Sequence, residues 1–176
     1  MRRFVATFAA VLALTPAIGH AAEIPCLTSG EFSSLSSYAL PNLIRGSAQH
    51  CAGVLPGDAF LRSSSDQLAS RYEARKKASW PGAKAAFIKI GSASNPQGMD
   101  IFKRMSDDAL QPLVDGLILG MVGQQFPTGR CSSVDRLVML LAPLPPENTA
   151  ELIGLAAGIG AKDGKAKVGQ LRICPA

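Results

Sequence analysis

The stretch 131-CSSVDRLVMLLAPLPP-146 carries the strongest fold signals of the chain. Ser132 and Asp135 fit the S-x-x-D pattern of a helix start, because a serine oxygen can accept a backbone N–H and an acid suits the positive end of a helix. Residues 137–144 are apolar throughout, and Pro145 and Pro146 end the run. A helix with almost no polar face is expected to be buried on most sides. We therefore expect a core helix here, with the rest of the chain packed around it.

The segments on either side of this stretch are predicted to be helices as well. Asn148 and Glu151 fit N-x-x-E, which predicts a returning helix and hence an αα-hairpin. Upstream, Ser106 precedes a long helix with an apolar stripe at helical spacing. That stripe consists of Leu110, Leu113, Leu117 and Met121. The same helix carries Gly116, Gly120 and Gly123, and this spacing predicts the close approach of a neighbouring helix in a soluble bundle.

Prolines divide the N-terminal half in this interpretation. Thr28 and Glu31 form a capping box that begins a helix over residues 28–40. Pro41 then begins a second helix, because proline suits a first turn. A third helix over residues 66–78 is expected to stop at Trp80-Pro81-Gly82, and a shorter one over residues 83–90 follows. Residues 92–98, SASNPQG, are predicted to be a loop.

Residues 1–21 have the features of a secretory signal peptide: two arginines, an apolar run and small residues before the cleavage point. The apolar run is too short to remain as a membrane anchor. Cleavage near Ala21 leaves a mature chain of residues 22–176 with no expected transmembrane segment. The protein is therefore expected to be periplasmic or secreted.

All four cysteines lie in the mature chain, and an exported protein enters an oxidising compartment. Two disulfides are therefore expected. Metal binding is not, because the cysteines lack C-x-x-C spacing and His50 is the one histidine after the signal; no cofactor is expected either.

Helix geometry favours one pairing of the cysteines over the others. An antiparallel hairpin that turns at Pro41 brings Cys26 and Cys51 to the same end, which favours a bond between them. If Pro41 only kinks a single helix, this pairing fails. Residues 165–176 are predicted to be an extended strap that returns to the C-terminal hairpin, which favours Cys131–Cys174.

Composition completes the predicted fold class. The mature chain of 155 residues is long enough for one domain with its own core. Hydrophobic residues make up 47% of the chain and aromatic residues 6%, a mixture typical of packed helices. We predict an all-α, single-domain bundle of about six or seven helices, built on αα-hairpins and stapled by two disulfides.

Catalytic chemistry has little basis in these residues. His50 and Cys51 are adjacent on a helix, so they point about 100° apart and cannot act together. Glu147 with Glu151, and Asp107 with Asp108, are the carboxylate pairs that a cell-wall-active hydrolase would need. Both pairs occupy helix first turns, where acids are expected for capping alone. A hydrolase of this kind remains an alternative.

A basic, aromatic segment over residues 71–84 is the candidate interaction surface. Its cations and rings could bind an unknown envelope protein or an anionic surface. The residues of this candidate surface are Arg71, Tyr72, Arg75, Lys76, Lys77, Trp80 and Lys84. Nucleic acid is not expected as a partner, because the formal charge of +5 falls to +3 without Arg2 and Arg3, and because the chain is exported.

The C-terminal half resembles small exported immunity proteins of bacteria in outline. A Gly-spaced helix, a cysteine-started helix, a proline turn, another helix and a terminal Cys-Pro carry the likeness. The resemblance implies an inhibitor-type binder and assigns no residues. The leading expectation is a non-catalytic binding or structural role. A small-ligand carrier is a further alternative, which requires an apolar cavity of a few hundred cubic ångströms. The sequence leaves the oligomeric state open.

Overall fold

The structure, a computed structural model, describes residues 26–125, 127–162, 167–168 and 171–174. This part of the chain is all-α, as predicted, with seven α-helices, one 3₁₀ turn and one pair of two-residue strands. The elements are α1 (Ser29–Cys51), α2 (Phe60–Ser63), α3 (Ser65–Ser94), α4 (Pro96–Arg104), α5 (Asp107–Gln125), η1 (Thr128–Arg130), α6 (Cys131–Leu141), α7 (Pro146–Lys162), β1 (Lys167–Val168) and β2 (Leu171–Arg172). The expected signal peptide and its cleavage point lie outside the described residues.

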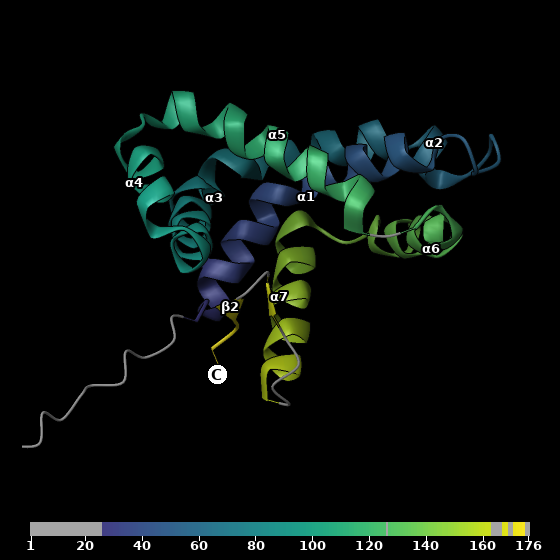
Figure 1. The fold of residues 1–176 in the computed structure, drawn as a ribbon. Helices are drawn as coiled ribbons and strands as arrows, with labels where there is room; N and C mark the ends of the chain where they lie inside the picture. Colours follow the sequence, from purple (N-terminus) through teal and green to yellow (C-terminus); the bar gives the residue numbers. More distant parts are fainter. Residues whose placement is uncertain (1–25, 126, 163–166, 169–170, 175–176) are drawn as a thin grey trace, which may run out of the picture.

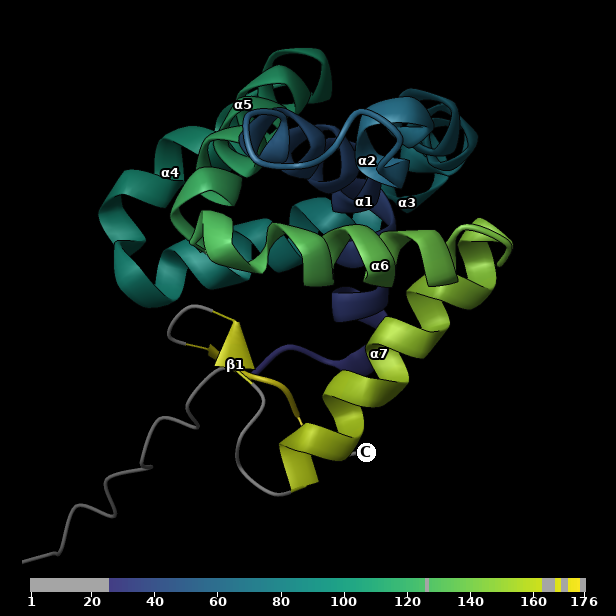
Figure 2. The same cartoon turned by 90° about the vertical axis from the view of Figure 1, so that its right-hand side faces the viewer.

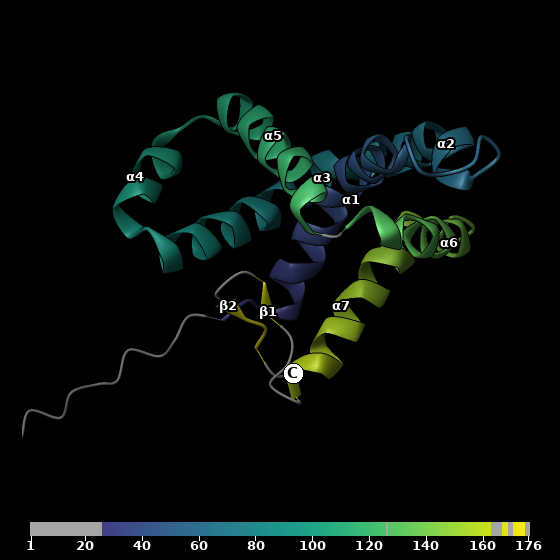
Figure 3. The same ribbon diagram turned by 45° about the vertical axis from the view of Figure 1, so that its right-hand side comes forward.

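Helix α1 lies at the centre of the fold. Helix α3 packs along it, α5 crosses it, and α7 lies beside its N-terminal half (Figures 1 and 3). The largest apolar cluster joins Tyr38 of α1, Trp80 of α3 and Leu110 of α5. The rings of Tyr38 and Trp80 stand 4.9 Å apart between centroids. Figure 2 shows α6 crossing one side of this assembly and α7 leading away from its end.

The predicted helix hairpin around Pro41 is wrong, because α1 is a single helix of 23 residues that contains Pro41. Proline inside a helix removes one backbone hydrogen bond and costs about 3 kcal/mol. Pro41 is fully buried among the helices that surround α1, and burial of this face offsets the cost. The beginning of the helix agrees with prediction: Thr28 and Glu31 form the capping box.

Pro81 likewise lies inside a helix instead of ending one. Helix α3 runs for 30 residues through Trp80-Pro81-Gly82, so the separate helix predicted over residues 83–90 is its continuation. Gly82 lets α3 pass close to α1 at this point, because a Cβ at this position would collide with Ser34 of α1. The predicted loop over residues 92–98 is mostly helical too, since α4 begins at Pro96 and Asn95 caps it.

Two disulfides form, but both predicted pairings are wrong. Cys26 bonds to Cys174, and Cys51 bonds to Cys131. Because α1 does not turn back at Pro41, Cys26 and Cys51 lie at opposite ends of a long helix. Cys51 therefore meets Cys131 at the start of α6, and Cys26 meets the extended tail.

The two ends of the described chain form one small sheet-like clamp. Leu27 N donates to Arg172 O at 2.9 Å, and Cys174 N donates to Leu27 O at 2.8 Å. Lys89 of α3 donates to Cys26 O at 3.0 Å and pairs with Glu31 at 2.8 Å. The described part of the tail, residues 167–168 and 171–174, is extended, as predicted, but it closes on Cys26 instead of Cys131.

The expectation of a buried core helix at residues 131–146 is also wrong. Cys131 is the one buried residue within α6, whereas Leu137, Met139 and Leu140 are 56%, 45% and 62% exposed. Val134 and Val138 pack inward beside the Cys51–Cys131 bridge. Asp135 does not cap its own helix: its carboxylate accepts a hydrogen bond from Leu61 N of α2 at 2.7 Å. The apolar run thus has one face packed against the protein and one face exposed to solvent.

Gly116 and Gly120 of α5 do not lie against a neighbouring helix. Gly116 and Gly120 have no atom within 4 Å of an added Cβ, and the surroundings of Gly123 lie outside what the structure describes. The close approach occurs instead at Gly46 of α1, where a Cβ would lie 2.9 Å from Val122 of α5. The predicted close approach is therefore wrong for Gly116 and Gly120.

The disulfide pairing has a measurable consequence for stability. The Cys51–Cys131 bridge closes a loop with a sequence separation of 80, and the Cys26–Cys174 bridge one of 148. We predict that replacing Cys51 and Cys131 by alanine lowers the free energy of unfolding by about 4 kcal/mol. Denaturant titration measures this loss. Non-reducing peptide mapping should join Cys26 to Cys174, and a Cys26–Cys51 peptide would contradict the fold.

The Glu31–Lys89 ion pair of the clamp should also make the free energy of unfolding depend on pH. Burial acts to raise the pKa of Glu31, but the bonds from Lys89 and Thr28 outweigh it and hold this pKa below the usual 4.5. A lowered folded-state pKa contributes stability above the unfolded pKa, and this stability is lost as the pH falls through the folded value. We predict a smaller acid loss of unfolding free energy in Lys89→Met than in the wild type. Equal losses in the two proteins would refute this role of the pair.

Candidate functional site

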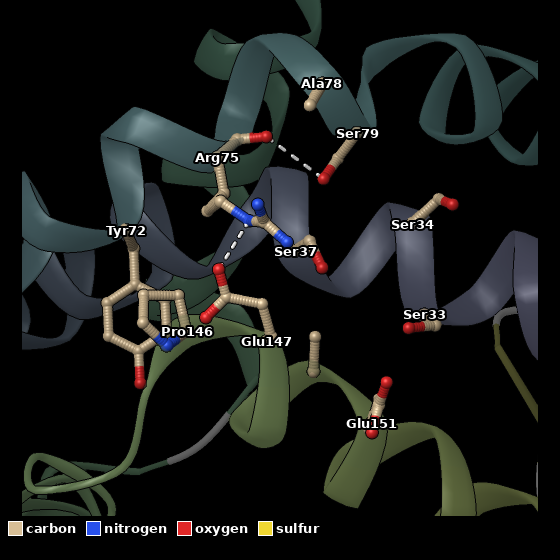
Figure 4. Close-up of a pocket in the computed structure, with 11 residues that line it drawn as sticks. Ser33, Ser34, Ser37, Tyr72, Arg75, Ala78, Ser79, Pro146, Glu147 and Glu151 are labelled. Atoms are coloured by element: carbon tan, nitrogen blue, oxygen red, sulfur yellow. Dashed lines mark hydrogen bonds and ion pairs between the residues drawn. The ribbon is translucent and has the colours of Figure 1, made fainter.

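A polar cleft of about 290 Å³ lies where α1, α3 and α7 meet (Figure 4). Serines of α1 form one wall, α3 forms another, and the first two turns of α7 form the third. The lining residues are Ser33, Ser34, Ser37, Tyr72, Arg75, Ala78, Ser79, Pro146, Glu147, Ala150 and Glu151.

The cleft exists because the facing side chains are short. Ser33 and Ser37 are one helical turn apart on α1, so they present small hydroxyls along the same face. Ala78 and Ser79 on α3 and Ala150 on α7 add little volume. Because these side chains are short, they do not fill the space between the three helices.

Arg75 and Glu147 span the cleft. Arg75 Nε of α3 lies 2.8 Å from Glu147 Oε1 of α7, and the two side chains are 51% and 40% exposed (Figure 4). A pair exposed to this extent contributes about 0–1 kcal/mol to stability. Glu151, one turn further along α7, makes no ion pair with any residue that the structure describes. The cleft therefore carries one cation and two carboxylates.

Tyr72 secures the deeper side of the cleft. Its hydroxyl and Thr149 Oγ1 are 2.8 Å apart in a buried hydrogen bond, and Tyr72 itself is 2% exposed. Thr149 also donates to Pro145 O at 3.2 Å. The Tyr72–Thr149 bond links α3 to the start of α7. Helix α7 begins at Pro146 instead of after the predicted cap Asn148.

These side chains are suited to binding a polar, positively charged group of a ligand. Hydroxyl oxygens and carboxylates accept hydrogen bonds, and the formal charge of the lining is negative. No histidine is among the lining residues, and Ser79 Oγ is already bonded to Arg75 O at 3.1 Å. Of the predicted carboxylate pair, both members reach the cleft, but Glu147 is engaged by Arg75. A hydrolytic mechanism would need both carboxylates available for proton transfer or attack.

The residues of the predicted interaction surface point in different directions around α3, because a helix has 3.6 residues per turn and they do not share one face. Tyr72 and Arg75 line the cleft, while Arg71 donates to Ala142 O at 2.8 Å. Lys77 is exposed and Trp80 is 4% exposed. On a further face, Lys84 binds Asp107 at 2.6 Å and holds the pKa of that carboxyl below its usual value.

Lys76 belongs to the scaffold. Its ammonium lies 2.7 Å from Asp115 of α5 and 5.0 Å from the centroid of the Tyr38 ring. Asn42 of α1 completes the group by donating to Asp115 at 2.9 Å. Lys76 thus connects α3 with α5 and α1, and its side chain is only 13% exposed.

Sequence reasoning missed the serines of α1. A signal was available in the spacing of Ser33 and Ser37, which predicts a polar stripe on a helix with an otherwise apolar inner face. That stripe could not be assigned to a site without knowing that α7 lies opposite it.

Comparisons with family models, with curated proteins and with solved structures give no match to the chain. Within the described residues, no helix is long and apolar enough to cross a membrane, and no three metal-ligating side chains gather.

Arg75 and Lys76 are adjacent cations whose replacement should have different effects. Lys76→Ala leaves the carboxylate of Asp115 partly buried without its cation, so we predict a loss of about 2 kcal/mol in the free energy of unfolding. Arg75→Ala removes an exposed pair and should cost at most about 1 kcal/mol. Chemical denaturation of both variants checks the order, and equal losses would contradict the assignment of Lys76 to the scaffold.

Proposed function

We propose that this protein is an exported binding protein with a non-catalytic role. One observation carries the proposal: the outer faces of α5, α6 and α7 are apolar and exposed. Most of the large exposed hydrophobic side chains among the described residues belong to these three helices. They are Leu113, Leu117, Leu119, Met121, Leu137, Met139, Leu140, Leu152, Leu155 and Ile159.

The pattern on α7 shows why this exposure points to a partner. Leu152, Leu155 and Ile159 follow the spacing i, i+3 and i+7, so they form one stripe along the helix. Leu155 and Ile159 are 64% and 60% exposed. Scattered apolar residues are normal on a surface, but contiguous apolar faces mark binding surfaces. The chain has no described element that covers this stripe.

The disulfides support an extracytoplasmic location. Both bridges would be reduced in a typical cytosol, and both join segments far apart in the sequence. The expected signal peptide agrees with this location. A binding protein held by two covalent links can expose apolar faces and still keep its fold.

A carrier of a small apolar ligand is the second candidate function. A groove of about 290 Å³ between α1, α5 and α7 has the size that such a role requires. Its lining is apolar apart from one serine: Phe32, Leu35, Ser36, Ala39, Leu40, Leu43, Ile118, Met121 and Ile153.

Site-specific crosslinking in cells tests the proposed role. A photoreactive residue at position 140, whose leucine is 62% exposed, should yield a discrete protein adduct. The same residue in place of Lys77, on exposed polar α3, is the control and should yield none. A lipid co-purifying with the protein, without adducts from position 140, would contradict the proposal in favour of the carrier.

A further inference from the structure

A second hollow, of about 400 Å³, continues from the polar cleft along the seam between α1 and α7. Ser33 and Glu151 line both hollows, so the two form one continuous depression, which we call the α1–α7 groove. Figure 4 shows Ser33 and Glu151 facing one another across it.

The floor of the groove is open because it is built from glycine and serine. A Cβ added to Gly158 of α7 or to Gly30 of α1 would meet no atom within 4 Å. One added to Gly154 would make ordinary contacts with Ser33 Cβ at 3.6 Å and Ser29 O at 3.9 Å. The two helices therefore leave the seam unfilled over several turns.

The chemistry changes from one end of the groove to the other. Glu147 and Glu151 lie at the first end, where Arg75 balances only one of the two negative charges. Leu155 and Ile159 wall the other end and are largely exposed. The distance along α7 from residue 147 to residue 159 is about 18 Å at 1.5 Å per residue. An extended peptide covers this length with about five or six residues.

We propose that the α1–α7 groove binds an extended segment of a partner protein that carries one lysine or arginine and, a few residues away, apolar side chains. The cation would lie against Glu151, which lacks a described ion pair, and the apolar side chains against Leu155 and Ile159. Charge complementarity argues for this occupant, because nucleic acid and anionic lipid would both meet the carboxylates unfavourably. The proposal rests on the proposed binding function and names the partner's chemistry.

Filling the groove is a test that the fold can tolerate. Gly158→Leu places a side chain in open space and replaces a poor helix former by a good one, so the melting temperature should not fall. Gly120→Leu on α5 is the matched control, because Gly120 is equally open and lies outside the groove.

The probe is a displayed library of random linear peptides, selected on the full disulfide-bonded protein. Enriched peptides should share a Lys or Arg followed or preceded at short spacing by apolar residues. Their affinity should fall at least about tenfold in Gly158→Leu and stay unchanged in Gly120→Leu. Glu151→Gln should weaken them roughly threefold to tenfold and reduce their salt dependence; Asp108→Asn, outside the groove, is its charge-matched control.

Several results would overturn the assignment. Enriched peptides that bind Gly158→Leu as tightly as the wild type would place the binding site elsewhere. A dimer in sedimentation that Gly158→Leu dissociates would give the groove to a second copy of this chain. A selection that yields no peptides, with the crosslinked adduct at position 140 still formed, would refute the groove and leave the binding function standing. If the selection yields no peptides and no adduct forms at position 140, the proposed groove and the proposed binding function are both refuted.

Discussion

The continuity of α1 through Pro41 is the constraint on which the rest of the structure depends. A continuous helix of 23 residues, bent within its length (Figures 1 and 3), can contact α3, α5 and α7 at once, and its two ends can each be joined to a distant segment by a disulfide. The missing hydrogen bond at Pro41 is a local cost, whereas the apolar clusters along α1 extend from Tyr38 to Cys51. Burial on this scale outweighs a single kink-prone residue.

The same helix gives the protein its candidate binding surface. On one face, α1 carries the large residues that form the core. On the face toward α7 it carries glycine and serine, so the two helices meet without filling the seam. Tyr72 and Thr149 hold α7 in place at one end of the seam, which keeps the hollow open. Small residues therefore shape the site, and a few charged ones define its polarity.

The sequence supported the helical class, the capping box at Thr28 and the presence of two disulfides, because these depend on local patterns and on the compartment. The pairing of the cysteines failed with the interpretation of Pro41 and Pro81, since tertiary burial decided whether those helices continued. The run at residues 137–144 failed for a related reason: hydrophobicity indicates a need for contact, but it does not say whether the contact lies inside the chain or with a partner. Glu147 and Glu151 were singled out by spacing, yet the cleft around them depends on serines 110 and more positions away.

The distance between two spin labels tests the continuity of α1 most directly. Positions 30 and 49 are both exposed and lie near opposite ends of the helix. An unbroken helix with a bend at the proline places their backbones somewhat less than about 28 Å apart, the length of a straight helix at 1.5 Å per residue. Pulsed electron resonance on the oxidised protein should return a single narrow distribution near that value. A distribution near about 10 Å, the spacing of two packed helices, would show that the chain turns at Pro41 and would contradict the account.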